Sequence, residues 1–217
     1  MLIRLQSLFV FLLFSLSISL FAAPAAATQT ILVFGDSLSA GYGLARGEDW
    51  PQLLAQRLQQ KKTDYTVVNA SISGETTQGG ANRIDNALRT HRPAIVILAL
   101  GANDGLRGTD LAAMRRNLER MIDAAQRAHA RVILVGMRIP PNYGPAYTEK
   151  FQATFREVSK IRRVPLVPFL LEGFADQRDY FQTDNLHPVA AAQPMILETL
   201  WKPLAPLLKI HQKQLVR

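Results

Sequence analysis

The sequence predicts an α/β protein of three layers, α/β/α, in which helices cover both faces of a parallel sheet of about five strands. Short apolar segments rich in Val and Ile alternate with longer amphipathic segments, and this alternation is typical of a mostly parallel sheet. The apolar segments have the composition of strands that are buried on both faces. A length of 217 residues, of which 48% are hydrophobic, favours a single domain.

Five strands and five helices are predicted in alternating order. The strands are expected at residues 30–34, 65–69, 94–100, 131–137 and 165–168, where the apolar runs lie. The helices are expected at residues 50–61, 80–90, 110–128, 147–161 and from 190 to about 207, where the pattern is amphipathic. Thr109 is predicted to cap the third helix, and Pro93 and Pro165 mark helix-to-strand turns.

The N-terminal segment has the form of a secretory signal peptide. Residues 1–27 carry one charge, Arg4, followed by an apolar run with an A-x-A cleavage site at Ala25, Ala26 and Ala27. The run is also long enough to span a bilayer, so a membrane anchor is the alternative. Because serines dilute the run and its Ala-rich end suits a signal peptidase, we expect cleavage, a mature domain of residues 28–217, and a periplasmic or secreted bacterial protein.

Composition narrows both the chemistry and the partners. The chain has no cysteine, which excludes disulfides, thiolate zinc sites and a cysteine nucleophile. A net charge of +8 is compatible with binding to nucleic acid. The basic residues, however, are spread over several predicted helices and form no recognised nucleic-acid-binding motif. We therefore expect no nucleic-acid partner and at most peripheral contact with anionic lipid headgroups.

Polar residues gather after the predicted strands, where ligands bind in parallel α/β sheets. The loops concerned contain Gly35-Asp36-Ser37, Asn69 to Gly74, Gly101 to Asp104, Arg138 to Tyr143, and Asp184 to Pro188. Because the carboxyl ends of parallel strands meet at one edge of the sheet, we expect all five loops to open on the same edge.

His187 and Asp184 have the spacing of an acid–base pair. A carboxylate three positions before a histidine in a Pro-flanked loop is able to accept from Nδ1 of the imidazole, which leaves Nε2 free to take a proton from a hydroxyl. Ser37, at the predicted strand-to-helix junction, supplies that hydroxyl. The alternative is that Asp184 caps the last helix and that His187 is incidental.

Three groups near this pair are candidates to stabilise an oxyanion. They are the backbone N–H groups of Ser37 and Gly74 and the side-chain amide of Asn103. Each has a simpler alternative, since Gly74 also suits a turn and Asn103 also suits an Asx-turn.

The spacing does not support two other kinds of site. The glycines near residues 41–47 and 74–80 match neither dinucleotide-binding nor P-loop patterns. A metal hydrolase could use Asp36, Asp104, Asp184 and His187, but no HExxH or paired-His spacing is present. We expect no metal ion and no other cofactor.

Four sequence blocks resemble those of the SGNH (GDSL) hydrolase family. They are "FGDSLS", "NASISGETT", "LGANDGLRG" and "DNLHP", which carry Ser37, Gly74, Asn103 and His187, and the resemblance extends from Ile31 to Leu207. With "RIPPNYG" and "AYTEKF", the chain looks most like the family's bacterial periplasmic thioesterase I/protease I/lysophospholipase L1 group and related secreted arylesterases. The third block has Ala102 where members of the group often have Gly.

The resemblance implies a fold, a set of roles and a substrate class. The fold would be the flavodoxin-like SGNH hydrolase fold. Ser37 would be the nucleophile, His187 the base and Asp184 its orienting partner, while the amides of Ser37 and Gly74 and the side chain of Asn103 would form the oxyanion hole. The expected function is hydrolysis of small-molecule acyl esters and thioesters through an acyl-enzyme, with lysophospholipids among the candidate substrates.

Two alternatives to this function stay open at the level of the sequence. One is a carbohydrate acetyl-esterase of the same superfamily, and the other is a non-catalytic periplasmic binding protein on the same kind of sheet.

The residues proposed to line an acyl pocket are Leu106, Ile139, Tyr143 and Phe181.

Overall fold

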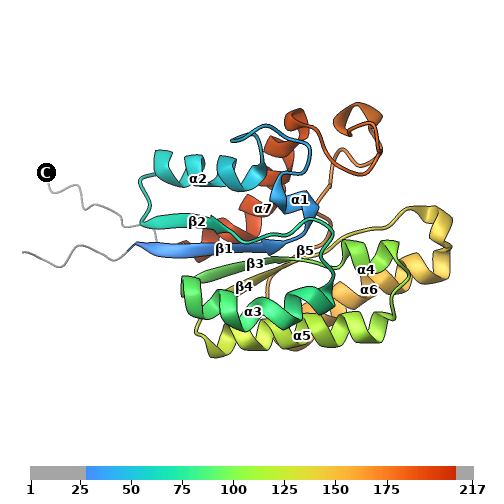
Figure 1. The fold of residues 1–217 in the computed structure, drawn as a ribbon, viewed down its shortest axis with the longest axis horizontal. Coiled ribbons are helices and arrows are strands. Elements are labelled where there is room, and N and C mark those ends of the chain that lie inside the picture. The colour runs from blue at the N-terminus through green and yellow to red at the C-terminus, as the bar shows by residue number, and fades with distance from the viewer. Residues whose placement is uncertain (1–27, 209–217) are drawn as a thin grey trace, which may run out of the picture.

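The computed structural model describes residues 28–208 and contains a five-stranded parallel sheet (Figure 1). The predicted signal segment, residues 1–27, and residues 209–217 lie outside the described part. The strands are β1 (Gln29–Gly35), β2 (Tyr65–Asn69), β3 (Ile95–Ala99), β4 (Arg131–Val135) and β5 (Leu166–Val167), in the spatial order β2-β1-β3-β4-β5. All neighbouring pairs are parallel. This is the flavodoxin-like order, in which the direction of winding reverses between β1 and β3.

Helices cover both faces of the sheet, which confirms the predicted three-layer class. One face carries α2 (Trp50–Gln60) and α7 (Gln193–Leu204), and the other carries α3 (Thr77–His91), α5 (Leu111–Arg127) and α6 (Pro145–Arg162) (Figure 1). Two short helices, α1 (Ser37–Ala40) and α4 (Ala102–Leu106), lie near the carboxyl ends of the strands. Single 3-10 turns occupy Pro141–Tyr143, Arg178–Tyr180, Ala190–Ala192 and Ala205–Leu207. Within residues 28–208, no helix combines the length and the apolar character needed to cross a membrane.

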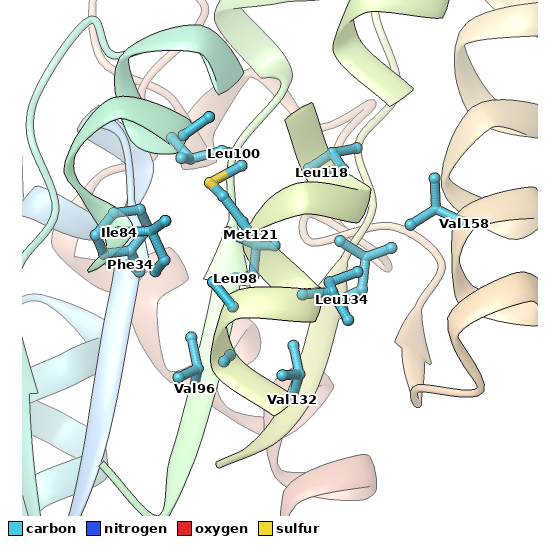
Figure 2. Close-up of a cluster of buried hydrophobic side chains, with 14 of the residues drawn as sticks. Phe34, Ile84, Val96, Leu98, Leu100, Leu118, Met121, Val132, Leu134 and Val158 are labelled. Atoms are coloured by element: carbon cyan, nitrogen blue, oxygen red, sulfur yellow. The ribbon is translucent and has the colours of Figure 1, made fainter. Parts of the chain in front are cut away.

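The hydrophobic core is divided into two parts by the sheet. Along β1, Ile31 and Val33 pack with α2 and α7, whereas Leu32 and Phe34 pack with α3 and α5. Strands β3 and β4 alternate in the same way, and Figure 2 shows the part of the core on the α3 and α5 side. All four β1 residues are fully buried, because a strand covered on both sides has no solvated face. The continuous apolar runs in the sequence are explained by this double burial.

The second predicted helix, expected at residues 80–90, begins earlier than predicted. Thr76 is the N-cap of α3 and accepts from the N–H of Gly79, so the helix starts at Thr77. Glycines normally weaken a helix, which is why the pair Gly79-Gly80 reads as the end of a loop. A Cβ on Gly80 would lie 2.4 Å from Cδ1 of Leu100. Gly80 therefore allows α3 to approach the end of β3 closely.

The predicted cap of the next helix is wrong by one residue. Asp110, not Thr109, is the N-cap of α5, and its carboxylate accepts from the N–H groups of Ala112 at 3.0 Å and Ala113 at 3.1 Å. The N–H of Thr109 instead donates to the carbonyl of Asp104 at 3.0 Å and closes the turn after α4. Thr109 thus belongs to the preceding turn, and the adjacent carboxylate begins the helix.

Candidate active site

The predicted polar loops meet at one edge of the sheet, as expected. A cleft of about 630 Å³ opens there, and residues that follow all five strands line it, among them Ser37, Gly74, Asn103, Arg138 and His187. The cleft lies at the ends of β1 and β3, where the winding of the sheet reverses. Leu106, Ile139 and Phe181 also line it, as predicted. Tyr143 is not a lining residue in the described structure, and its hydroxyl instead donates to the carbonyl of Leu106 at 2.8 Å.

Ser37 is the first residue of the four-residue helix α1. Asp36 is the N-cap, and its Oδ1 accepts from the N–H of Leu38 at 3.1 Å. The short helix is held from outside, because the indole N–H of Trp50 donates to the carbonyl of Leu38 at 3.1 Å and Nδ2 of Asn69 donates to the carbonyl of Ser39 at 2.7 Å. Ser37 is therefore fixed at the end of β1 although α1 is too short to be stable alone.

Ser37, His187 and Asp184 form a continuous hydrogen-bonded chain. Nε2 of His187 lies 2.9 Å from Oγ of Ser37, and Nδ1 of His187 lies 2.6 Å from Oδ2 of Asp184. Oδ1 of Asp184 accepts from the backbone N–H groups of Leu186 at 2.9 Å and His187 at 3.0 Å. Helix α7 begins only at Gln193, so Asp184 does not cap the last helix. Both ring nitrogens of His187 have a side-chain partner, and its role in catalysis stays a prediction.

The environment of Asp184 keeps its side chain ionised. Desolvation acts to raise its pKa, but the two backbone N–H groups and the imidazole of His187 outweigh it and lower the pKa to about 2. The side chain is 37% exposed, so part of this stabilisation is shared with solvent. Because this pKa lies far below neutrality, the Asp184 side chain is ionised at neutral pH.

The three candidate oxyanion donors lie on the wall of the same cleft. The backbone N–H groups of Ser37 and Gly74 have no hydrogen-bond acceptor within residues 28–208. Gly74 has φ of 79°, a left-handed conformation that favours glycine, and its carbonyl accepts from Arg107 at 3.0 Å. Two N–H groups without protein acceptors beside a serine hydroxyl are suited to receive a ligand oxygen.

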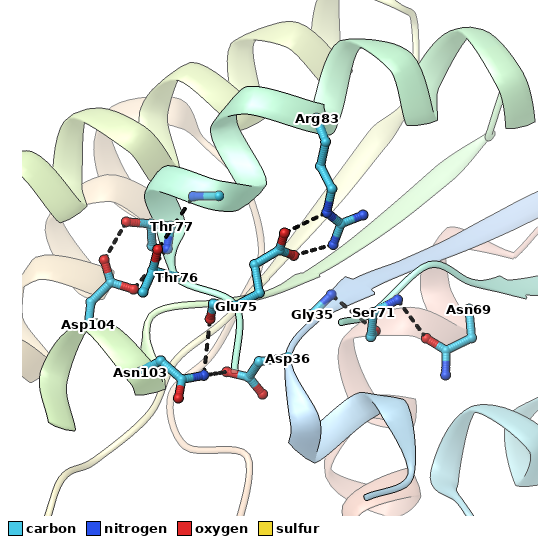
Figure 3. Close-up of polar contacts among 11 residues, drawn as sticks. Gly35, Asp36, Asn69, Ser71, Glu75, Thr76, Thr77, Arg83, Asn103 and Asp104 are labelled. Carbon is cyan, nitrogen blue, oxygen red and sulfur yellow. Dashed lines mark hydrogen bonds and ion pairs between the residues drawn. The ribbon is translucent and has the colours of Figure 1, made fainter. Parts of the chain in front are cut away.

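Asn103 is anchored by two of the neighbouring loops. Its Nδ2 donates to the carbonyl of Glu75 at 3.0 Å and lies 3.4 Å from Oδ2 of Asp36 (Figure 3). The next residue, Asp104, is buried and accepts from both the N–H and the hydroxyl of Thr77, at 2.8 Å and 2.6 Å. These contacts join α4 to the first turn of α3 and so hold the Asn103 amide at the cleft. Ala102 also lines the cleft.

From the sequence, Asp36 was a candidate only as a metal ligand, and Tyr42 and Gln182 were not candidate site residues. A Gly-Asp-Ser sequence at a strand end is the available signal for Asp36, since Asp is a favoured N-cap. Tyr42 lies with its ring centroid 4.4 Å from that of His187, and Gln182 contacts the backbone at Tyr42. Within residues 28–208, no group of three or more His, Cys, Asp or Glu side chains is arranged to hold a metal ion.

Asp36 has a strongly perturbed acidity. The side chain is only 2% exposed, and burial, with smaller contributions from nearby Asp104 and Glu75, raises its pKa from 3.8 to about 7, although the N–H of Leu38 acts to lower it. A carboxyl whose pKa is raised on folding stabilises the folded state fully below the unfolded pKa. That stabilisation is lost as the pH rises through the folded pKa.

Replacing Asp36 with Asn is therefore expected to change how stability depends on pH. Relative to the wild type, the free energy of unfolding of Asp36→Asn should increase between about pH 4 and pH 7, by up to about 4 kcal/mol for a difference of about three pKa units. Urea denaturation of both proteins at pH 4, 5, 6, 7 and 8 measures this. Asp49→Asn, at a partly exposed N-cap, is the control. A difference between Asp36→Asn and wild type that stays constant with pH would contradict the expectation.

Comparisons with known proteins show the family of the chain and agree with its fold. Residues 33–193 match the GDSL-like lipase/acylhydrolase family. The chain is 46% identical over 183 residues to the esterase TesA of Pseudomonas aeruginosa. The aligned residues cover 84% of this chain and 91% of the relative. The chain is 41% identical over 183 residues to thioesterase 1/protease 1/lysophospholipase L1 of Escherichia coli K12, with 84% and 86% covered.

A solved structure gives the same result. The esterase EstA from Pseudoalteromonas sp., described as inhibited by monoethylphosphonate, matches with a TM-score of 0.79 at 39% identity, covering 82% of this chain and 97% of that one. The family named from the four sequence blocks, its fold and the predicted class of carboxylic-ester hydrolase are confirmed by these relatives. The chain belongs to the GDSL-like lipase/acylhydrolase family.

Proposed function

We propose that the chain is a serine hydrolase that cleaves acyl esters and thioesters through an acyl-enzyme. The observation that carries this proposal is the hydrogen-bonded chain from Ser37 through His187 to Asp184, with distances of 2.9 Å and 2.6 Å. Family membership and the names of the relatives, which include an esterase, a thioesterase and an arylesterase, support it.

The proposed reaction has two halves. Oγ of Ser37 attacks the acyl carbon while Nε2 of His187 takes the hydroxyl proton, and Asp184 stabilises the imidazolium that forms. The tetrahedral oxyanion accepts from the N–H groups of Ser37 and Gly74 and from the Asn103 amide. When the carbon–oxygen or carbon–sulfur bond breaks, the imidazolium gives its proton to the leaving alcohol or thiol. Water then attacks the acyl carbon while Nε2 of His187 takes one of its protons, and that proton passes to Oγ of Ser37 as the bond from Oγ to the acyl carbon breaks and the acid is released.

Replacing Asn103 with Ala is expected to lower kcat by about 10²- to 10³-fold, because an oxyanion donor acts mainly in the transition state. In the structure, Nδ2 of Asn103 lies 3.4 Å from Oδ2 of Asp36. This contact is long for a hydrogen bond, and the proposed oxyanion would take the place of Asp36 as the acceptor. The measurement is kcat and KM for a 4-nitrophenyl ester, with the melting temperature as a check on folding. Asn82→Ala, at an exposed asparagine on α3, is the matched control. A loss confined to KM would remove Asn103 from this role.

The cleft supports a substrate with a single flexible acyl chain. Its volume of about 630 Å³ and its lining by Leu106, Ile139, Phe169, Leu171 and Phe181 provide an apolar site beside Ser37. Neighbouring chain lengths should be distinguished weakly, since one methylene contributes only about 1–3 kcal/mol to specificity.

A substrate panel tests this assignment. We expect kcat/KM to vary gradually for 4-nitrophenyl esters of two to sixteen carbons, with measurable activity on acyl thioesters and on a lysophospholipid. Activity restricted to acetyl groups on a carbohydrate would instead identify the acetyl-esterase alternative. Failure of a fluorophosphonate to label Ser37, together with no hydrolysis of any ester, would favour the non-catalytic binding protein.

We also propose that residues 1–27 direct export to the periplasm or the medium and are then removed. The supporting observations are the apolar run and the Ala25-Ala26-Ala27 ending of the segment. The intact mass of the exported protein, expressed from the full sequence in a bacterium, should correspond to a chain that begins near Thr28. An N-terminus at Met1 in the membrane fraction would identify a membrane anchor.

A further inference from the structure

Gln182 joins the loop after α1, the helix that begins with Ser37, to the loop that carries His187. Its side-chain Nε2 donates to the carbonyl of Tyr42 at 2.8 Å and lies 3.3 Å from the carbonyl of Pro188. Its backbone N–H donates to the carbonyl of His187 at 2.8 Å. One residue is thus bonded both to the loop after α1 and to the loop of Asp184 and His187, although Tyr42 and Gln182 are 140 positions apart in sequence.

Tyr42 connects this contact to the backbone of Ser37 and to the side chain of His187. Its N–H donates to the carbonyl of Ser37 at 3.4 Å, and its ring packs on the imidazole of His187 with centroids 4.4 Å apart and planes at 38°. Tyr42 is 52% exposed, so its side chain is not part of the hydrophobic core. The carbonyl that Gln182 holds therefore belongs to the residue that covers the imidazole.

The fit around the Gln182 amide is close. Gly43 has φ of 71°, and a Cβ built on it would lie 2.1 Å from Oε1 and 2.8 Å from Cδ of Gln182. The amide therefore occupies the space that any other residue at position 43 would need. This observation is independent of the hydrogen bonds, and it places the Gln182 side chain firmly against the backbone that follows α1.

Few hydrogen bonds join the segment of the base to the segment of the nucleophile. Asp184 orients the imidazole within its own loop, and the bridge between Phe181 and Pro188 closes that loop at its base. Within residues 28–208, hydrogen bonds from residues 181–189 to residues 37–44 are limited to the His187–Ser37 contact itself and the Gln182–Tyr42 bond. Besides the ring contact between Tyr42 and His187, the Gln182 bond thus supports the alignment of Nε2 with Oγ.

We propose that Gln182 is a positioning residue, which holds the His187 loop at the distance that lets Nε2 accept the Ser37 proton. The inference rests on the proposed function, because it assigns Gln182 a role in the same proton transfer. Misplacing a reacting group by about 1 Å is able to cost about 10²-fold in rate. The loss of Gln182 should therefore reduce the chemical step and leave substrate binding nearly unchanged.

The test uses two variants of Gln182, a matched control, and Gly43→Ala made both in the wild type and in Gln182→Ala. Gln182→Met keeps the length of the side chain and removes the donor, whereas Gln182→Ala removes both. Gln177→Ala removes a side-chain amide that also donates to a backbone carbonyl, that of Gly173 at 3.0 Å, but lies outside the two loops. For each protein we would measure kcat and KM for a 4-nitrophenyl ester, the rate of inactivation by a fluorophosphonate, and the melting temperature.

We expect both Gln182 variants to lose about 10- to 100-fold in kcat and in the inactivation rate, with KM within about twofold and a melting temperature near that of Gln177→Ala. Gly43→Ala should lower kcat more when it is made in the wild type than when it is made in Gln182→Ala. In the Gln182→Ala background the amide that would clash with the new Cβ is absent. A kcat within twofold of wild type, or a loss that follows the melting temperature, would overturn the inference. Activity that survives Ser37→Ala would overturn the proposed function instead.

Discussion

Replacing Ser37 with Ala is expected to lower kcat by about 10⁴-fold or more, with little change in stability. The hydroxyl is the only atom removed, and its hydrogen-bond partner is His187 at 2.9 Å. Ala is a good helix former, and α1 keeps its Asp36 cap and its contacts with Trp50 and Asn69. The folded variant should bind substrate but form no acyl-enzyme.

Steady-state kinetics and a circular-dichroism melt measure the two halves of this expectation. A fluorophosphonate should add its mass to the peptide that contains Ser37 in the wild type and to no peptide of Ser37→Ala. Residual activity within tenfold of wild type, with a normal melt, would show that another group is the nucleophile.

Replacing Asp184 with Asn is expected to cost about 10⁴-fold in kcat, more than replacing it with Ala. Oδ1 of Asp184 accepts from two backbone N–H groups, so the oxygen of an Asn must take that position. Its NH₂ then lies where Oδ2 was, 2.6 Å from Nδ1 of His187, and donates to that nitrogen. The imidazole proton is forced onto Nε2, which is then unable to accept from Ser37.

The comparison with Asp184→Ala separates this effect from loss of the carboxylate. At 37% exposure, the site of the missing side chain is open to water, which permits either tautomer of the imidazole. We therefore expect kcat to decrease in the order wild type, Asp184→Ala, Asp184→Asn. Equal or higher activity for the Asn variant would show that Asp184 does not determine the tautomer of His187. Backbone amide exchange at Leu186 and His187 checks that the turn is intact in Asp184→Asn.

Strands and loop positions were predictable because their signals are local. The apolar runs are a direct result of double burial, as at Ile31 to Phe34, and the Asp184–His187 contact spans three residues. The short helices α1 and α4 were not predicted, since four or five residues are too few to show a helical period. Thr109 was predicted as the cap of α5, but its N–H closes the turn after α4, and the cap is Asp110.

The parts of the site that are made by side chains of Ser, His and Asp were predictable from the sequence. Ser37 and His187 lie 150 positions apart, and their meeting followed from the order of loops at the edge of a parallel sheet and from the resemblance to a family. Their catalytic roles stay predictions until the variants above are measured. The contact between Gln182 and Tyr42 had no such signal, because a backbone carbonyl is an acceptor at every residue.

The distance of 150 positions between Ser37 and His187 also has a consequence for when activity begins. A chain is made from its N-terminus at about 5–20 residues per second, so the base emerges on the order of 10 s after the nucleophile. Helix α7, which covers one face of the sheet, is made after both. If Ser37 is the nucleophile and His187 the base, Ser37 becomes reactive only when these last segments have folded back onto the first strand. The proposed hydrolysis would then begin only in molecules whose C-terminal segments have been made.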